Sequence, residues 1–226
     1  MFKNNSIQGI ILINKPKGIT SHDVVDIVRR RLKIKRVGHA GTLDPLAEGL
    51  LVVLVGRSTK LFSKFASFDK EYIGVLKLGE ATTTGDSQGE IREKHDWTQI
   101  DAQNIREVFS LFAGATEQIP PMVSALRVKG KRLYNLARRG IVVERSPRKI
   151  RIHSLEVLKI GLPFVEFRIH CSKGTYVRKL AEDIGEKLGC GAHMVKILRL
   201  KIGTFELAKA VAPEEINESH LQQFTS

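Results

Sequence analysis

The segment of residues 39–49, HAGTLDPLAEG, contains the densest group of side chains that could carry out chemistry. Pro45 disfavours the α conformation for Asp44, and the flanking glycines let a ligand or another backbone come close. A carboxylate held in this way, beside the apolar run of residues 50–55, could act as a nucleophile or a general base. The alternative is structural, because Asp-Pro is also a common turn initiator. The residues alone leave both interpretations open.

A second candidate is the segment of residues 171–178, CSKGTYVR, which joins an alternating pattern to a helical one. The N-terminal ends of helices bind anions, so Tyr176 and Arg178 in a first turn could contact a phosphate. The segment lacks the GxxxxGK[ST] pattern of a P-loop. Ordinary helix capping with an exposed arginine explains it equally well.

Other catalytic signatures are missing from the sequence. It has no GxSxG elbow and no GxGxxG fingerprint. Cys171 and Cys190 lie far apart without a CxxC pair, and the histidines have no regular spacing, so neither a disulfide framework nor a zinc site is indicated. By themselves, His39 is typical of a loop histidine and Tyr72 of a half-buried strand tyrosine. We therefore expect no metal site.

The elements that must position these residues follow from local periodicity. Helices are predicted for residues 22–32, with Ser21 as N-cap, for residues 105–112, ending at Gly114, and for residues 177–188, ending at Gly189. Residues 37–49 should form a loop. Strands are predicted for residues 9–14, 50–55, 71–78 and 164–171. Because strands and helices alternate irregularly, we expect an α+β fold with a mixed, largely antiparallel central sheet and flanking helices.

Positive charge is concentrated in two segments. The chain of 226 residues has 37 basic and 24 acidic residues, a net charge of +13. Residues 29–36 contain six basic residues and no acidic one, and residues 127–151 contain ten basic residues and one acidic residue. Two such segments favour a nucleic-acid partner, although a solvated, solubilising surface is the simpler alternative. Aromatic residues make up 6% of the chain, too few for a multi-base stacking platform.

Hydropathy argues against a membrane protein. The longest uninterrupted apolar run, residues 50–55, is far shorter than the ~20 residues that span a bilayer. The apolar run near the N-terminus, residues 10–13, is too short for the core of a secretion signal. With two isolated cysteines, this pattern predicts a cytoplasmic protein.

Six segments together resemble the TruB family of tRNA pseudouridine synthases, and they cover nearly everything between Gly9 and Phe205. The ordered occurrence of GTLDP and CSKGTYVR is far more specific than either motif alone. The six segments are GIILINKPKGITSHDVV, RVGHAGTLDPLAEGLLVV, KEYIGVLKLGEATTTGDSQGE, QIPPMVSALRVKGKRLYNLARRG, VERSPRKI and CSKGTYVRKLAEDIGEKLGCGAH.

The resemblance implies an isomerase that converts uridine 55 in the tRNA T-loop to pseudouridine by base flipping, without a cofactor. It implies that Asp44 attacks the target nucleotide and that Arg178 pairs with Asp44. Tyr72 would stack on the base and take part in moving the C5 proton. The remaining implied site residues are Tyr176 and Ile197 in the uracil pocket, His39 beside the flipped nucleotide, and Asp86 in a supporting role.

The resemblance also implies a domain organisation and an RNA interface. Residues 1–205 would form the catalytic domain with an RNA-binding insertion at about residues 120–150, and residues 206–226 a short C-terminal segment without a full PUA domain. Arg199 stands alone where the family often has two arginines. We expect a monomer that binds the T-arm of tRNA. The predicted backbone contacts are Arg29, Arg30, Arg31, Lys33, Lys35, Arg36, Lys129, Lys131, Arg132, Arg138 and Arg139.

Two further functions compete with the isomerase. A module that binds and remodels tRNA without needing turnover would also have RNA affinity, but it would not need Asp44, Tyr72 and Arg178. A ribosome-associated structural protein would account for the charge, but it would leave the GTLDP and GTYVR segments without a purpose. The three residues are all present, which favours the enzyme.

Overall fold

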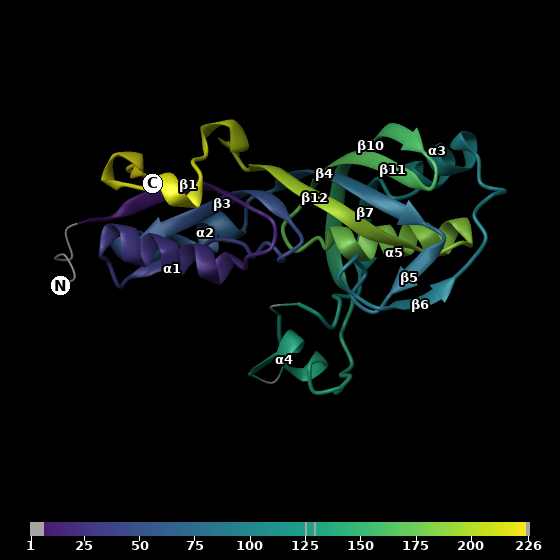
Figure 1. Cartoon of the computed structure of the whole chain (residues 1–226), viewed down its shortest axis with the longest axis horizontal. Helices are drawn as coiled ribbons and strands as arrows, with labels where there is room; N and C mark the ends of the chain where they lie inside the picture. Colours follow the sequence, from purple (N-terminus) through teal and green to yellow (C-terminus); the bar gives the residue numbers. More distant parts are fainter. Residues whose placement is uncertain (1–6, 125, 129, 225–226) are drawn as a thin grey trace. The chain divides into compact units, whose positions relative to one another are not determined.

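The computed structural model describes residues 7–124, 126–128 and 130–224. The chain forms two compact units (Figure 1). The first comprises Met1–Tyr72 and Leu198–Ser226, and the second comprises Ile73–Ile197. Strands β4 (Lys70–Leu78) and β12 (Ala192–Ile202) have residues in both units.

The first unit is built on strand β3 (Glu48–Val55). Strands β1 (Gly9–Lys15) and β2 (Val37–His39) pair antiparallel with β3, and the end of β12 pairs parallel with its start, Leu198 opposite Glu48. The short strand β13 (Phe205–Glu206) pairs antiparallel with β12. Because side chains alternate along β1 and β3, the two strands contribute to two separate cores. Helix α1 (Ser21–Leu32) covers one face. The other face is closed by Phe65 of helix α2 (Phe62–Ala66), which follows the 3-10 helix η1 (Gly56–Leu61).

Helix α1 spans Ser21–Leu32, close to the predicted range. Its N-cap is Thr20 and not Ser21, so the predicted cap was wrong by one residue. The Thr20 hydroxyl accepts the Asp23 backbone N–H, and the Asp23 carboxylate accepts the Thr20 N–H, which together form a capping box. This arrangement leaves the Ser21 hydroxyl available for a tertiary contact. Lys33 ends the helix in the left-handed conformation.

The second unit contains a sheet with the strand order β12-β4-β11-β10-β7. Strand β11 (Phe164–Cys171) pairs antiparallel with β10 (Arg148–Gly161), which pairs antiparallel with β7 (Gly114–Gln118). Helix α5 (Val177–Leu188) lies along one face of this sheet (Figure 1), and helix α3 (Ala102–Ser110) packs its Phe109 ring against Phe167 of β11. Strands β5 (Glu80–Thr82) and β6 (Ile91–Lys94) form a separate hairpin. The predicted α+β fold with a mixed, largely antiparallel sheet is confirmed.

Helix ends differ from the predictions in one case. Helix α5 ends at Gly189 in the left-handed conformation, as its sequence predicts. Helix α3 ends at Ser110, whereas Gly114 starts strand β7 and caps no helix. The extended pairing of β7 with β10 competes with continuation of the helix at this point.

The basic segment contains strands β8 (Arg127–Val128) and β9 (Lys131–Arg132) and the short helix α4 (Leu133–Ala137). Helix α4 begins only at Leu133, because residues 131 and 132 pair with β8. Lys129 and the side chain of Arg132 lie outside the described residues.

The C-terminal segment runs back along β1. It contains the 3-10 helices η2 (Leu207–Lys209), η3 (Pro213–Glu215) and η4 (Glu218–His220). Val211 exchanges backbone hydrogen bonds with Leu12 and Asn14, and Gln222 with Ile10. These bonds satisfy backbone groups that an edge strand would otherwise leave unpaired. In the part of the chain that the structure describes, we find no helix long and apolar enough to cross a membrane.

Candidate active site

Asp44 lies on the loop that joins β2 to β3 in the first unit, and hydrogen bonds hold the backbone on both sides of it. The buried Ser21 hydroxyl accepts the Leu43 N–H at 2.8 Å and donates to the Leu43 carbonyl at 3.0 Å. After Asp44, the Pro45 carbonyl accepts the N–H of Gly18 at 2.8 Å. Gly18, between β1 and α1, and Ser21, the first residue of α1, thus fix the backbone that carries the half-buried Asp44 side chain.

Arg199 of β12 holds the same loop from another direction. Its side chain is 1% exposed, and Nε donates to the Leu50 carbonyl at 2.7 Å. The two terminal nitrogens donate to the carbonyls of Gly41, at 3.1 Å, and Thr42, at 3.4 Å. Gly49 has φ +102°, and a Cβ there would collide with the Arg199 backbone, which explains the glycine. One buried guanidinium therefore joins the start of the loop to β3.

A buried cation lies in the electrostatic environment of Asp44. Lys15 is fully buried and donates from Nζ to the carbonyls of Pro16, at 2.8 Å, and Ile19, at 2.7 Å. Burial lowers the pKa of this ammonium group to about 8, while the Asp44 and Glu48 carboxylates act in the opposite direction. The charge of Asp44 therefore favours the protonated form of Lys15.

Arg178 and Asp86 form an ion pair in the second unit. Arg178 lies in the first turn of α5 and is 3% exposed. Its Nε lies 3.6 Å from Oδ2 of Asp86, and its terminal nitrogens donate to the carbonyls of Thr84, at 2.6 Å, and Val123, at 2.7 Å. Oδ1 of Asp86 in turn accepts the Thr84 hydroxyl and the Gln88 N–H. Asp86 therefore orients the guanidinium of Arg178.

Gln118 at the end of β7 anchors the backbone at the start of α5. Its side chain is 5% exposed and forms two hydrogen bonds with Tyr176. The Tyr176 N–H donates to Oε1 at 2.8 Å, and Nε2 donates to the Tyr176 carbonyl at 3.1 Å. This is the pattern of hydrogen bonds that two paired strand residues exchange.

Sequence reasoning missed Ser21, Lys15, Arg199 and Gln118 as parts of the site. The sequence did offer a signal for Arg199. It lies two residues after the buried Ile197 in the alternating pattern of β12, so both side chains point to the same face of the strand. Gln118 gives a weaker signal as a polar residue at an inward position just before Pro120 and Pro121.

The remaining predicted site residues fall into the two units. His39 ends strand β2, because residues 37–39 find a partner in β3 where a loop was expected. Tyr72 is buried in β4. Asp44, His39 and Tyr72 belong to the first unit, and Arg178, Asp86, Tyr176 and Ile197 to the second. Of these, the structure brings Arg178 and Asp86 together, and the pairing of Arg178 with Asp44 stays a prediction.

The basic residues near α1 are engaged to different extents. Arg29 pairs with Asp26 at 2.8 Å and donates to the Val37 carbonyl. Nε of Arg31 donates to the Ile216 carbonyl, and Nε of Arg36 to the Thr59 hydroxyl. Like Arg31 and Arg36, the side chains of Arg30, Lys33 and Lys35 are exposed and extend this cationic surface.

The second basic segment presents exposed cations around α4. Lys131, Arg138 and Arg139 are exposed, and the Arg138 guanidinium lies over the Tyr134 ring at 5.6 Å. Arg145 donates to the Pro120 carbonyl at 3.0 Å. The segment therefore carries both internal links and cations open to solvent.

Comparison with known proteins decides the family. Residues 29–177 match the N-terminal domain of the TruB family of pseudouridylate synthases, and residues 178–224 match the C-terminal domain of tRNA pseudouridylate synthase B. The chain belongs to the TruB family. This TruB-family chain is 48% identical to tRNA pseudouridine synthase B of Clostridium tetani, over 96% of the chain and 75% of the relative. It is 50% identical to the protein of the same name from Protochlamydia amoebophila, over 93% and 80%.

Solved structures agree with this assignment. A Cbf5–Nop10–Gar1 complex contains a chain similar to this one with a TM-score of 0.71 and 29% identity, over 90% of this TruB-family chain and 52% of that chain. An H/ACA RNP bound to a substrate RNA containing 2′-deoxyuridine gives a TM-score of 0.67 and 27% identity, over 92% and 51%. The TruB-family chain thus spans about half the length of these two. The predictions of a pseudouridine synthase and of an isomerase are confirmed.

Proposed function

We propose that this chain isomerises uridine 55 in the T-loop of tRNA to pseudouridine. In this reaction the bond from C1′ to N1 breaks, the uracil turns, and a bond from C1′ to C5 forms. C5 loses its proton and N1 gains one, so no electron or group is transferred and no cofactor is required. A carboxylate that adds to the nucleotide and later departs is sufficient, and Asp44 is that carboxylate.

The anchored backbone around Asp44 is the observation that carries this proposal. Ser21 and Arg199 hold the loop before Asp44, Gly18 holds the residue after it, and all three contacts are independent of any ligand. A carboxylate positioned in advance spends less binding energy on its own ordering when RNA arrives. A turn that served only to reverse the chain would not need this support.

The other site residues take the roles that their chemistry allows. The target nucleotide must leave the stack, because C1′ and C5 are inaccessible in a stacked loop. Tyr72 stacks on the flipped base and takes part in moving the C5 proton, and Tyr176 and Ile197 line the uracil pocket. Arg178, oriented by Asp86, pairs with Asp44. His39 occupies the space beside the flipped nucleotide.

We assign RNA binding to the two basic segments. We also propose that the protein acts as a monomer in the cytoplasm. Exposed cations contact phosphates and set the position of the T-arm, while the pocket selects the uridine. These cations are Arg30, Lys33, Lys35, Lys131, Arg138 and Arg139, with Lys129 and Arg132 as expected additions from the sequence and Arg29, Arg31 and Arg36 in a mixed structural role.

Release of tritium from C5-labelled uridine in an unmodified T-arm RNA tests the proposal under single-turnover conditions. Wild type should release label, and Asp44→Asn should bind the RNA but release none. Asp96→Asn, which changes an exposed carboxylate in a surface turn, is the matched control and should behave as wild type. A second RNA, with cytidine at position 55 and C5-labelled uridine at its other positions, tests whether uridine 55 is the target.

Three outcomes would contradict parts of the proposal. Release by Asp44→Asn at the wild-type rate would remove Asp44 as nucleophile. Release from the RNA with cytidine 55 would contradict the position. Binding by the wild type without release from any tRNA would favour the tRNA-binding module over the enzyme.

A further inference from the structure

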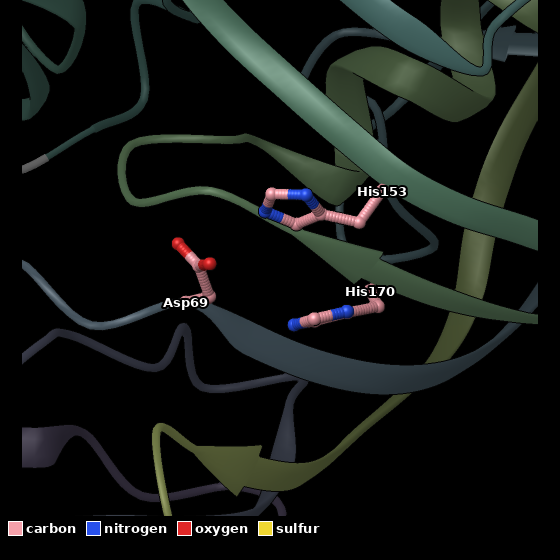
Figure 2. A group of neighbouring side chains, drawn as sticks. All are labelled: Asp69, His153 and His170. Carbon is pink, nitrogen blue, oxygen red and sulfur yellow. The ribbon is translucent and has the colours of Figure 1, made fainter.

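Two histidines lie side by side on the sheet of the second unit, and the proposed isomerisation uses neither. His153 is on β10 and His170 on the adjacent strand β11. Both side chains are exposed, their ring centroids lie 4.6 Å apart, and the rings are inclined by 37°. Figure 2 shows the two imidazoles projecting from their strands toward the same side. Asp69, also drawn there, belongs to the first unit.

A β-bulge lies at the histidine pair. The register pairs Ile152 with Cys171 and then Ser154 with His170, so His153 is the extra residue of β10 at this point. A bulge re-aims the side chain of its extra residue and is not expected where a strand only needs to pair. His153, Ser154 and His170 are all exposed here, so His153 shares the solvent-facing side of the strand pair with His170. The irregularity in pairing therefore coincides with the placement of two metal-ligating groups.

The ligand chemistry fits a transition-metal ion. Each ring offers one nitrogen, and these two nitrogens lie within 4.8 Å of each other. Small rotations of the two exposed rings would let both nitrogens bind one Zn²⁺ ion, each at the usual Zn–N distance of ~2.0–2.1 Å. Because the rings are carried by paired strands, little backbone freedom is lost when an ion binds. Imidazole favours Zn²⁺, Ni²⁺ and Cu²⁺ over Mg²⁺ or Ca²⁺.

We propose that His153 and His170 form a binding site for one divalent transition-metal ion that clips β10 to β11. The site supplies two protein ligands, and water completes the coordination. Its role is to hold the strand pair at the bulge, so the ion stabilises the folded chain by mass action and takes no part in the isomerisation. The spacing of the two histidines in the sequence does not indicate this site, because the pairing of β10 with β11 brings them together.

Calorimetric titration of the full chain with zinc chloride tests the proposal. Wild type should bind one equivalent of Zn²⁺ saturably. The variants His153→Ala and His170→Ala should each fail to bind this equivalent. His95→Ala is the matched control, because His95 is also exposed and lies 3.2 Å from Glu93, and this variant should keep the equivalent. Zinc should raise the Tm of wild type and of His95→Ala, and leave the Tm of the other two variants unchanged.

A second measurement needs no substitution. Zn²⁺ should protect His153 and His170 of the wild type from modification by diethyl pyrocarbonate, and leave His95 reactive, as read by peptide mass spectrometry. The proposal is overturned if wild type binds no zinc equivalent, if the equivalent survives in the double variant His153→Ala/His170→Ala, or if zinc protects neither histidine. Reduced RNA binding by the two variants without zinc binding by wild type would instead make the pair an RNA contact.

Discussion

The Ser21 hydroxyl exchanges two hydrogen bonds with the backbone of Leu43, although the two residues are 22 positions apart. The exchange joins the first turn of α1 to the residue directly before Asp44. It is available because Thr20, and not Ser21, caps the helix. A capping motif that secures a helix thus also frees a neighbouring side chain to hold the proposed catalytic loop.

Ser21→Ala should reduce both stability and turnover. The substitution leaves the N–H and the carbonyl of the buried Leu43 without their partner, at a cost of about 1–3 kcal/mol in the free energy of unfolding. Turnover per folded molecule should fall because Asp44 loses a fixed position. Urea unfolding and single-turnover tritium release measure the two effects. Ser67→Ala, which removes an exposed hydroxyl bonded to the Lys64 carbonyl, should change neither stability nor turnover. Turnover at the wild-type rate in Ser21→Ala would show that Ser21 does not position Asp44.

Arg199→Lys should impair the chain although it keeps the charge. An ammonium group cannot direct donors to the carbonyls of Gly41, Thr42 and Leu50 at once, and each buried carbonyl left unpaired costs on the order of 1–3 kcal/mol. We expect lower stability and a lower rate of the chemical step, with RNA affinity little changed because Arg199 is buried. Arg106→Lys on the exposed surface of α3 is the control. If Arg199→Lys lowered RNA affinity as much as the rate of the chemical step, Arg199 would contact the RNA directly.

Gln118→Glu should add a pH dependence in the neutral to acidic range that comes from the new carboxyl group. At neutral pH the carboxylate still accepts the Tyr176 N–H but faces the Tyr176 carbonyl without a donor. Burial favours the neutral acid, which can donate again, so stability and turnover should recover as the pH falls from 7.5 toward 5. Unfolding and single-turnover rates at several pH values measure this recovery. The exposed Gln103→Glu should show no such recovery, and a flat profile in Gln118→Glu would refute the anchoring role.

Lys15 should make stability rise with pH in the alkaline range. Its pKa is about 8 in the folded chain and 10.5 in the unfolded one, so between these values the unfolded state binds more protons. This contribution to the free energy of unfolding therefore increases from pH 8 to pH 10.5, with a slope of at most about 1.4 kcal/mol per pH unit. Denaturant unfolding of wild type and Lys15→Met over this range should show a steeper rise for wild type. Parallel curves would contradict the lowered pKa.

RNA affinity should weaken steeply with salt. Each phosphate that a cation neutralises releases counterions, so the slope of log affinity against log salt should become shallower by about 0.7–0.9 for every phosphate that a variant no longer binds. Charge reversals at Lys131 and Arg139 should each produce this change, whereas Lys187→Glu, on the exposed side of α5, should not. Filter binding of T-arm RNA at several salt concentrations measures the slopes. A flat response in wild type would remove the basic segments from the interface.

The sequence by itself determined features that depend on local periodicity and composition. The alternation of residues 164–171 predicts β11, and the apolar spacing of residues 177–188 with Gly189 predicts α5 and its end. The glycine-flanked Asp44-Pro45 motif and the two basic segments can be recognised in the same way. These signals lie within one or two turns of the chain, where geometry alone fixes which side chains share a face.

Only the tertiary structure decided how the loop around Asp44 is held and which charges meet. Arg199 reaches Gly41 across 158 positions, Arg178 reaches Thr84 across 94, and Gln118 reaches Tyr176 across 58. The strand formed by residues 37–39 and the bulge at His153 likewise depend on partner strands. A buried polar group must find a partner wherever the fold brings one, and no local pattern records which distant carbonyl or carboxylate that will be.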